Sequence, residues 1–309
     1  MSKTAYIFPG QGSQYVKMGE DLYNTYLSAR AVFEEADKIL GFSLSKLCFE
    51  GPEEELTLTK NAQPALLVMS IATLAAAREA IPGVLPEPVY VAGHSLGEYT
   101  ALAVAGALDF STAVVLARER GRLMYEAGLE KPGAMAAIIG ISREIATIIC
   151  EETGAFIANL NSPGQVVISG ATEHVNIASA LAKERGAKYA IPLHVSGAFH
   201  SPLMESAAVG LESYITKSKF SDPDIPVIGN IAAQTINTAA AVRNELLEQV
   251  CNCVQWEATV RYLLSQGVDT FIEIGPGDVL TGMLPRISND AATINIGDCG
   301  TIEALRVKY

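Results

Sequence analysis

VYVAGHSLGEY, residues 89–99, contains the pattern G-x-S-x-G around Ser95. Residues 89–92 are apolar or aromatic and predict a buried strand, and the Ala-rich stretch 99–107 predicts a helix. This context favours a nucleophile elbow, because glycines two positions before and after the serine allow the chain to bend sharply. We therefore expect the Ser95 hydroxyl to project from the bend. The backbone N–H of Leu96, at the start of the helix, is then placed to donate to an oxyanion.

Apolar strands alternate with helices on both sides of this segment. Strands are predicted at 4–8, 226–230 and 270–274, and helices at 31–39, 63–78 and 257–265. Such alternation is typical of a parallel sheet covered by helices. The expected fold class is α/β, with a hydrolase-like large domain built on a parallel sheet.

The middle of the chain follows a different order of elements. Its predicted order is strand, helix, strand, strand, helix, strand, at 134–139, 143–153, 156–161, 165–169, 173–185 and 188–193. A βαββαβ order suits a ferredoxin-like unit, in which two helices cover one face of an antiparallel sheet. We therefore expect a large α/β catalytic domain formed by residues 1–131 and 197–309, and an inserted ferredoxin-like small domain at 132–196.

A serine hydroxyl is a weak nucleophile and needs a base, and the chain contains four histidines. His94 adjoins the serine and is given a supporting role, while His174 begins a predicted surface helix. His194 ends a predicted strand, where a buried core histidine is an alternative interpretation. His200 follows the serine in a loop, which is the chain order of hydrolase-like sheets, and position favours it. No carboxylate that would orient its ring can be assigned.

Composition limits the classes of partner. The 309 residues are 49% hydrophobic and carry a formal net charge of −12, so the chain can bury a large core and has no overall positive field for nucleic acid. An anionic partner would have to meet a local basic patch, for which Lys183, Arg185 and Lys188 are candidates. We expect no nucleic-acid partner.

Membrane and metal sites are also disfavoured. The N-terminus lacks a secretory apolar run, and the longest apolar stretch, 65–77, is shorter than the roughly 20 residues that span a bilayer. The five cysteines are scattered without a CxxC pair and predict neither disulfides nor a zinc site. We expect a cytoplasmic protein with no membrane association and no metal.

Several motifs together resemble the malonyl-CoA:acyl carrier protein transacylase family. They occur in the order PGQGSQ (9–14), QPALL (63–67), GHSLGEY (93–99), RERG (118–121), NSPGQVVISG (161–170), AFHSPLM (198–204), QW (255–256) and EIGPGDVLTG (273–282). The set spans nearly the whole chain, which makes the joint match specific. The acyltransferase domains of polyketide and fatty acid synthases share these motifs. PGQGSQ also lacks the third glycine of a dinucleotide-binding loop.

The resemblance implies a serine–histidine dyad. Ser95 would carry the acyl group as an ester, and His200 would act as base and then as acid. In the family a backbone carbonyl orients the histidine, and the matching residue is Gln255. The matching second oxyanion donor, beside Leu96, is the amide of Gln14.

The resemblance also implies the substrate. Arg120 matches the arginine that pairs with the free carboxylate of malonyl, although Arg118, Arg120 and Arg122 alone would suggest a solvated helix face. A planar guanidinium holds a carboxylate through two hydrogen bonds. Phe199, in GAFH where malonyl-selective domains often have HAFH, should disfavour a branched acyl group.

The remaining implied site residues have an alternative interpretation. Asn161 and Gln165 match polar residues of the cleft between the two domains, but they are equally suited to capping a hairpin turn.

The expected reaction moves malonyl from its coenzyme A thioester to the phosphopantetheine thiol of acyl carrier protein, in fatty acid biosynthesis. Malonyl-CoA is a substrate, and no bound cofactor is implied. The alternatives are a polyketide synthase acyltransferase acting in trans, a serine esterase or thioesterase, and a non-catalytic protein that docks the carrier. The esterase remains open because an elbow and a histidine serve hydrolysis equally well.

Overall fold

The computed structural model describes residues 2–308 and contains two β-sheets. The larger sheet has the strand order β10-β9-β1-β2-β7-β8, and its pairs are parallel except for β7 with β8. Its strands are β1 (Thr4–Phe8), β2 (Tyr90–Gly93), β7 (Val227–Ile228), β8 (Thr235–Ile236), β9 (Thr270–Ile274) and β10 (Ala292–Ile296). The expected α/β fold with a mostly parallel sheet is confirmed.

Strand β1 is buried along its whole length because both faces of the sheet are covered. Its alternate residues Tyr6 and Phe8 belong to the large core beneath one face, and Ala5 and Ile7 belong to a second core beneath the other. The side chains of successive strand residues point to opposite faces, so an unbroken apolar run serves both cores. This explains why the strand reads as continuously hydrophobic.

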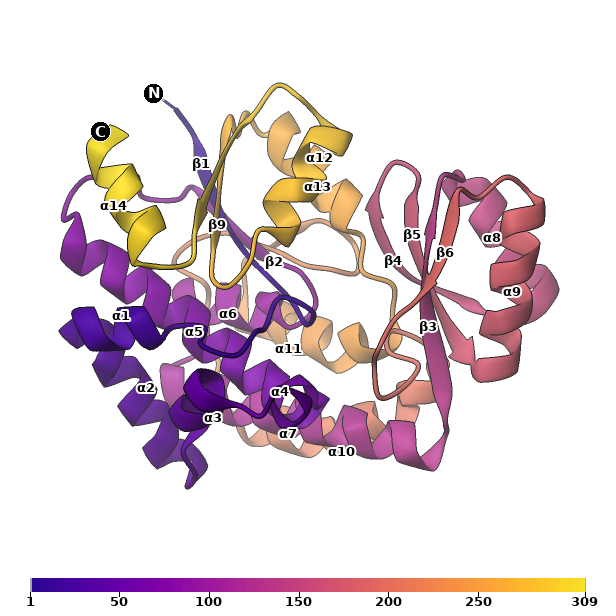
Figure 1. Ribbon diagram of the computed structural model, residues 1–309, viewed down its shortest axis with the longest axis horizontal. Helices are drawn as coiled ribbons and strands as arrows, with labels where there is room; N and C mark the ends of the chain where they lie inside the picture. Colours follow the sequence, from indigo (N-terminus) through magenta and orange to yellow (C-terminus); the bar gives the residue numbers. More distant parts are fainter. Residues whose placement is uncertain (1, 309) are drawn as a thin grey trace.

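Helices form a layer on each side of this sheet (Figure 1). α12 (Trp256–Ser265) and α13 (Val279–Ile287) contribute to the second core, and α5 (Thr59–Ala80) is the buried centre of the first. The other helices of this part are α1 (Glu20–Thr25), α2 (Leu27–Leu40), α3 (Leu44–Glu50), α4 (Glu53–Thr57), α6 (Gly97–Val104), α7 (Phe110–Glu130), α10 (Glu205–Lys217), α11 (Ala239–Glu248) and α14 (Cys299–Lys308), with short 3₁₀ turns at Pro202–Met204 and Gln249–Cys251.

The smaller sheet is antiparallel and lies beside the larger one (Figure 1). Its strand order is β4-β5-β3-β6, formed by β3 (Gly133–Ile139), β4 (Phe156–Ser162), β5 (Gln165–Ala171) and β6 (Tyr189–Pro192). α8 (Arg143–Thr153) and α9 (Thr172–Glu184) pack on it through a separate core. The arrangement is the expected split βαβ pattern.

One backbone bridge ties this unit to the larger part. Asn159 in β4 pairs in parallel with Val254, and the N–H of Leu160 donates to the carbonyl of Val254 at 2.9 Å. All strands of the small sheet fall within residues 132–196, and those of the large sheet fall outside. The division into two domains at these boundaries stays a prediction.

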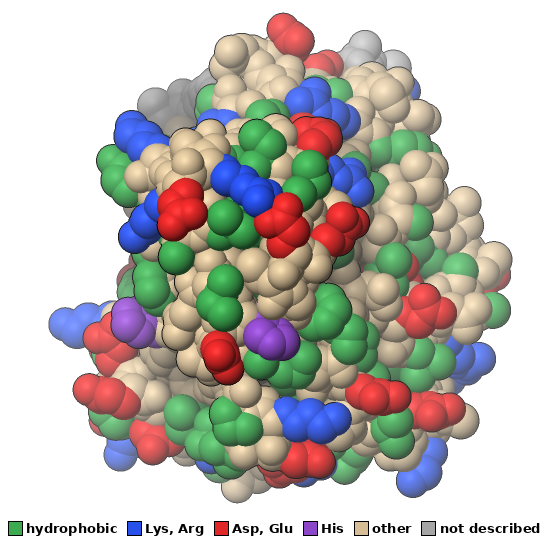
Figure 2. All heavy atoms as spheres, turned by 90° about the vertical axis from the view of Figure 1, so that its right-hand side faces the viewer, with side chains coloured by type: hydrophobic (Ala, Val, Ile, Leu, Met, Phe, Trp, Pro, Cys, Tyr) green, Lys and Arg blue, Asp and Glu red, His purple; other side chains and the backbone are tan. Residues whose placement is uncertain are grey.

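The face that carries the small unit is mixed in charge (Figure 2). Blue and red side chains alternate over it, and Arg185 of the proposed basic cluster forms an ion pair with Glu152. One member of that cluster is therefore paired with an acidic side chain.

Candidate active site

The chain bends at Ser95, between β2 and α6. Ser95 has φ +52°, in the left-handed region that non-glycine residues rarely adopt. The bend requires close backbone contact, because a Cβ on Gly93 would lie 1.9 Å from the carbonyl carbon of Gly97. Asn230 holds the bend: its Oδ1 accepts the N–H of Ser95 at 2.7 Å, and its Nδ2 donates to the carbonyl of Gly93 at 2.8 Å.

His200 meets the serine from a loop that is distant in sequence. Its Nε2 lies 2.8 Å from Ser95 Oγ, and its Nδ1 lies 3.0 Å from the carbonyl oxygen of Gln249 and 3.1 Å from that of Asn252. Two acceptors at Nδ1 assign the proton to that nitrogen, so the lone pair of Nε2 faces the serine hydroxyl.

The protonation state of His200 follows from its surroundings. The ring is buried, and burial together with the positive charge of Arg120 lowers its pKa to about 3. The imidazole is therefore neutral at pH 7 and able to accept a proton from Ser95.

Arg120 is the buried member of its group of three arginines. Arg118 donates to the Lys60 carbonyl and Arg122 pairs with Glu119 and Glu126, whereas the Arg120 side chain is 1% exposed. Its position on the inner side of α7 turns the guanidinium toward the elbow.

The contacts of Arg120 are neutral. Nη2 donates to Ser95 Oγ at 3.1 Å and to Gln249 Oε1 at 2.9 Å, and Nη1 donates to Gln63 Oε1 at 2.8 Å. Burial lowers its pKa, but a guanidinium remains charged in proteins. Within residues 2–308, no carboxylate forms an ion pair with it. A buried positive charge without a counter-ion is suited to bind an anion.

These residues line one cavity of about 390 Å³. Its wall includes Ser95, His200, Arg120, Phe199, Gln11, Gln14, Gln63, His94, Met124, Met135, Asn159 and His194. The volume suits a small-molecule site. A nucleophile, a neutral base and a cation therefore converge on a single space.

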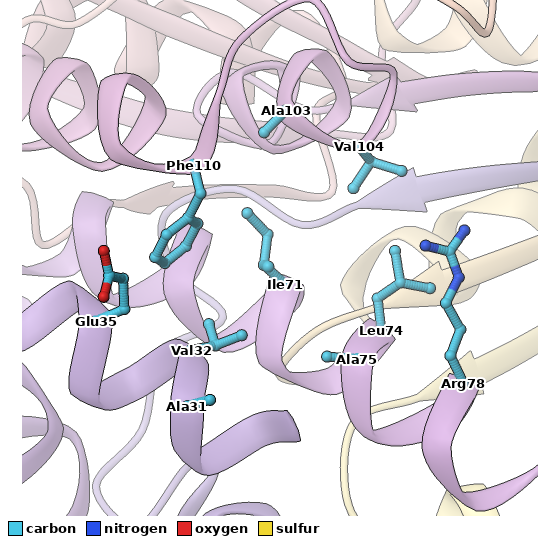
Figure 3. A pocket seen from close by; sticks show the side chains of 10 residues that line it. All are labelled: Ala31, Val32, Glu35, Ile71, Leu74, Ala75, Arg78, Ala103, Val104 and Phe110. Carbon is cyan, nitrogen blue, oxygen red and sulfur yellow. The ribbon is translucent and has the colours of Figure 1, made fainter. Parts of the chain in front are cut away.

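A larger cavity of about 560 Å³ lies among α2, α5, α6 and α7 (Figure 3). Its lining is mostly aliphatic, and Glu35 and Arg78 are its charged residues. It contains no serine, cysteine or histidine. The acyl-transfer chemistry that Ser95 can perform belongs to the smaller cavity.

Comparison with known proteins decides the family. A model of the acyl transferase domain matches residues 5–296. The chain belongs to the acyl transferase family. Malonyl CoA-acyl carrier protein transacylase from Bacillus subtilis (strain 168) is 48% identical over 308 residues, which cover 98% of this chain and 96% of that protein. The protein of the same name from Escherichia coli (strain K12) is 44% identical, with 93% of each chain covered.

Solved structures of acyl transferases have the same fold. An acyl-carrier-protein-S-malonyltransferase from Bartonella henselae has a TM-score of 0.94 at 40% identity, with 99% of each chain covered. A malonyl-transacylase in complex with a type II PKS acyl-carrier protein has a TM-score of 0.95 at 41% identity, with 100% of each chain covered. The resemblance inferred from the motifs is therefore confirmed.

The prediction that the Gln255 carbonyl orients His200 is wrong. The carbonyls that face His200 Nδ1 are those of Gln249 and Asn252, at the 3₁₀ turn that follows α11. The Gln249 carbonyl, which also accepts the N–H of Asn252 at 3.3 Å, and the Asn252 carbonyl at the end of the turn both face the ring. Gln255 instead directly precedes α12, donates its N–H to the Asn230 carbonyl and lines a different cavity, which includes Ser142.

The oxyanion roles of Leu96 and Gln14 stay predictions, but the structure shows where the two residues lie. Leu96 is the residue before α6, directly after the nucleophile. Gln14 lines the cavity, and its Oε1 accepts the N–H of Gly12 at 2.8 Å. The PGQGSQ segment closely approaches the elbow at Gly10, where an added Cβ would lie 2.5 Å from the His94 carbonyl oxygen. The N–H of the next residue, Gln11, is therefore a further candidate donor, and the role of Gln14 stays a prediction.

Of the other predicted binding residues, Phe199, Asn161 and Gln165, only Phe199 lines the cavity. Phe199 is buried against the cavity beside the base. Asn161 Oδ1 accepts from His94 Nε2 at 2.9 Å. Gln165 Oε1 accepts from Arg286 at 2.8 Å, away from the serine. Neither Asn161 nor Gln165 lines the cavity, and their binding roles stay predictions.

Sequence reasoning missed the polar residues that support the dyad. Gln249, Glu98 and Asn230 are buried and are connected to Ser95 through hydrogen bonds. Glu98 belongs to the elbow motif GHSLGEY, but the sequence does not indicate that this charged residue is buried. Gln249 has no distinguishing sequence pattern.

The described residues were compared with what a metal site or a membrane span requires. In that part of the chain, no three histidine, cysteine or acidic side chains are grouped so as to hold a metal ion. None of the described helices is both long enough and apolar enough to cross a bilayer.

Proposed function

We propose that this chain is a malonyl-CoA:acyl carrier protein transacylase that works through an ester on Ser95. The observation that carries the proposal is the position of Arg120, whose Nη2 lies 3.1 Å from the nucleophilic oxygen while the guanidinium has no acidic partner among residues 2–308. A malonyl group on Ser95 would carry its free carboxylate a short distance from the ester carbonyl. The buried guanidinium is placed to receive that carboxylate.

In the first half-reaction, Ser95 Oγ attacks the thioester carbonyl of malonyl-CoA. His200 Nε2 takes the serine proton, and the Gln249 and Asn252 carbonyls hold the resulting imidazolium through Nδ1–H. The amide of Leu96 and an amide of the PGQGSQ segment are the proposed oxyanion donors. The C–S bond then breaks, and the proton on His200 passes to the leaving coenzyme A thiolate.

The second half-reaction reverses these roles. The phosphopantetheine thiol of the carrier gives its proton to His200 Nε2 and attacks the Ser95 ester. The bond between the acyl carbon and Ser95 Oγ then breaks, and the departing oxygen takes the proton from His200, which restores the serine hydroxyl. Nucleophile, base and carboxylate partner are all side chains of this chain, so the proposed reaction needs no bound cofactor besides its substrates.

Acyl carrier protein is the proposed partner. A solved relative of similar length is described in complex with a type II PKS acyl-carrier protein, and the curated relatives are named for the carrier of malonyl. We propose a role in fatty acid synthesis in the cytoplasm.

Malonyl transfer to carriers tests this proposal. With malonyl-CoA as donor, a fatty acid synthesis carrier in its phosphopantetheine form should be malonylated rapidly, and its apo form should not react. A type II polyketide carrier in the same assay reports how far partner choice extends. Steady release of malonate with no malonyl carrier formed would instead identify a thioesterase.

The pH dependence of acylation follows from the neutral base. The active form of His200 is deprotonated, and its pKa is lowered to about 3, so activity is lost only as the pH falls toward that value. We expect kcat/KM for malonyl-CoA, which reports the free enzyme, to change by less than about twofold between pH 8 and about pH 5. Stopped-flow acylation with circular dichroism at each pH measures this. A half-loss at about pH 6.5, the usual pKa of histidine, would contradict it.

A further inference from the structure

A buried carboxylate lies behind the site and takes no part in the proposed chemistry. Glu98 is the first-turn residue of α6, three positions after the nucleophile, and it is 0% exposed. Its Oε2 accepts from Gln249 Nε2 at 2.7 Å and from the N–H of Asn230 at 3.3 Å. Its Oε1 has no hydrogen-bond partner among the described residues. Burying a carboxylate in this way is costly, which calls for a physical reason.

The partners of Glu98 hold both sides of the nucleophile. Asn230 Oδ1 accepts the N–H of Ser95, and Gln249 Nε2 donates to the carbonyl of Ser95 at 2.9 Å. Ser95 is held at an unfavourable positive φ, so it depends on such contacts to keep its conformation.

Gln249 also connects Glu98 to the cation of the site. Its Oε1 accepts from Arg120 Nη2, while its Nε2 faces Glu98 and the Ser95 carbonyl. Gln249 is fully buried, so no water can replace a lost partner. Without the Glu98 oxygen, one N–H of this amide would be left unpaired, and the side chain would shift to find another acceptor.

We propose that Glu98 is a positioning residue that sets the Arg120 guanidinium relative to Ser95, through the side chain of Gln249. The proposal rests on the proposed function, because it takes Arg120 as the partner of the malonyl carboxylate. Protonated or ionised, the carboxyl of Glu98 accepts the same N–H at Oε2. The positioning role therefore does not depend on its charge, although burial raises the pKa of Glu98 and favours the neutral form.

The test compares kcat/KM for malonyl-CoA and acetyl-CoA, since an acetyl group has no carboxylate for Arg120 to hold. In Glu98→Leu, which removes the acceptor, the malonyl-to-acetyl ratio should fall by about tenfold as Arg120 is displaced. In Glu98→Gln, whose amide oxygen can still accept from Gln249, the ratio should stay within about twofold of the parent. A purely structural role would lower both rates together and leave the ratio unchanged.

Glu273→Gln is the matched control. Glu273 is also a fully buried carboxylate, but its oxygens accept from Leu280 and Thr281 and do not contact Gln249. The ratio should be unchanged in this variant. If Glu98→Leu fails to fold, Gln249→Leu removes the next link in the same chain and should lower the ratio to a similar extent.

Two outcomes overturn the proposal. An unchanged ratio in Glu98→Leu, or in Gln249→Leu where the first variant does not fold, would show that Arg120 is positioned without Glu98. A rise in the ratio would show that Glu98 weakens the attraction of Arg120 for the malonyl carboxylate and does not position the guanidinium. The parent enzyme separates these outcomes from failure of the proposed function, because a parent without malonyl preference would contradict the role of Arg120 itself.

Discussion

Replacing Ser95 with alanine should lower malonyl transfer to the carrier by at least about 10⁴-fold and remove the covalent intermediate. The reaction has no other path, because the oxygen that His200 activates at 2.8 Å would be missing. Transfer rates and the intact mass of the protein after incubation with malonyl-CoA measure both effects. Ser213→Ala, on the exposed face of α10, is the control and should behave as the parent does.

The stability of Ser95→Ala distinguishes loss of chemistry from loss of fold. The backbone contacts of residue 95 with Asn230 and Gln249 do not involve the hydroxyl, so the variant should fold with a thermal midpoint close to that of the parent. A folded variant that still acquires a malonyl adduct at the parent's rate would place the nucleophile elsewhere.

Replacing Arg120 with alanine should lower kcat/KM for malonyl-CoA by about 10²-fold or more and spare acetyl transfer. The change removes a charge-assisted pair with the malonyl carboxylate, which the acetyl group never forms. The rates for both thioesters, measured side by side, provide the ratio that decides the prediction.

Arg122→Ala provides the control for this change. Arg122 lies on the same helix, but it pairs with Glu119 and Glu126 at the surface. Its loss should leave the acyl preference intact. Equal losses for malonyl and acetyl in Arg120→Ala would mean that the arginine supports the site as a whole and does not select the acyl group.

The regular elements of the fold could be predicted from local patterns. The strand at 4–8 agrees with β1, the helix at 143–153 agrees with α8, and the strand at 270–274 agrees with β9. Each has an apolar period or run that agrees with its burial. The edge strand β10 was not predicted; it is a short run at the edge of the sheet, and its first two residues, Ala292 and Thr293, are exposed. β7 has only two residues where a strand over 226–230 was expected.

The site was less accessible to sequence reasoning because it depends on distant contacts. Ser95 is identified by a local motif, but the partner of His200 Nδ1 is set by how the turn at 249–252 folds over the ring. The family resemblance assigned this role to Gln255 of the QW motif, three residues beyond that turn. Arg120 differs from its two neighbouring arginines only in burial, and no local spacing distinguishes it.

The most direct test of the account is to map the acyl group on the parent enzyme. The protein is incubated with malonyl-CoA in the absence of carrier, digested, and examined by peptide mass spectrometry. The account predicts one malonyl group per chain, on the peptide that contains Ser95. This malonyl group should be lost from the enzyme when carrier in its phosphopantetheine form is added. A malonyl group on another residue, or continuous release of malonate with no adduct, would contradict it.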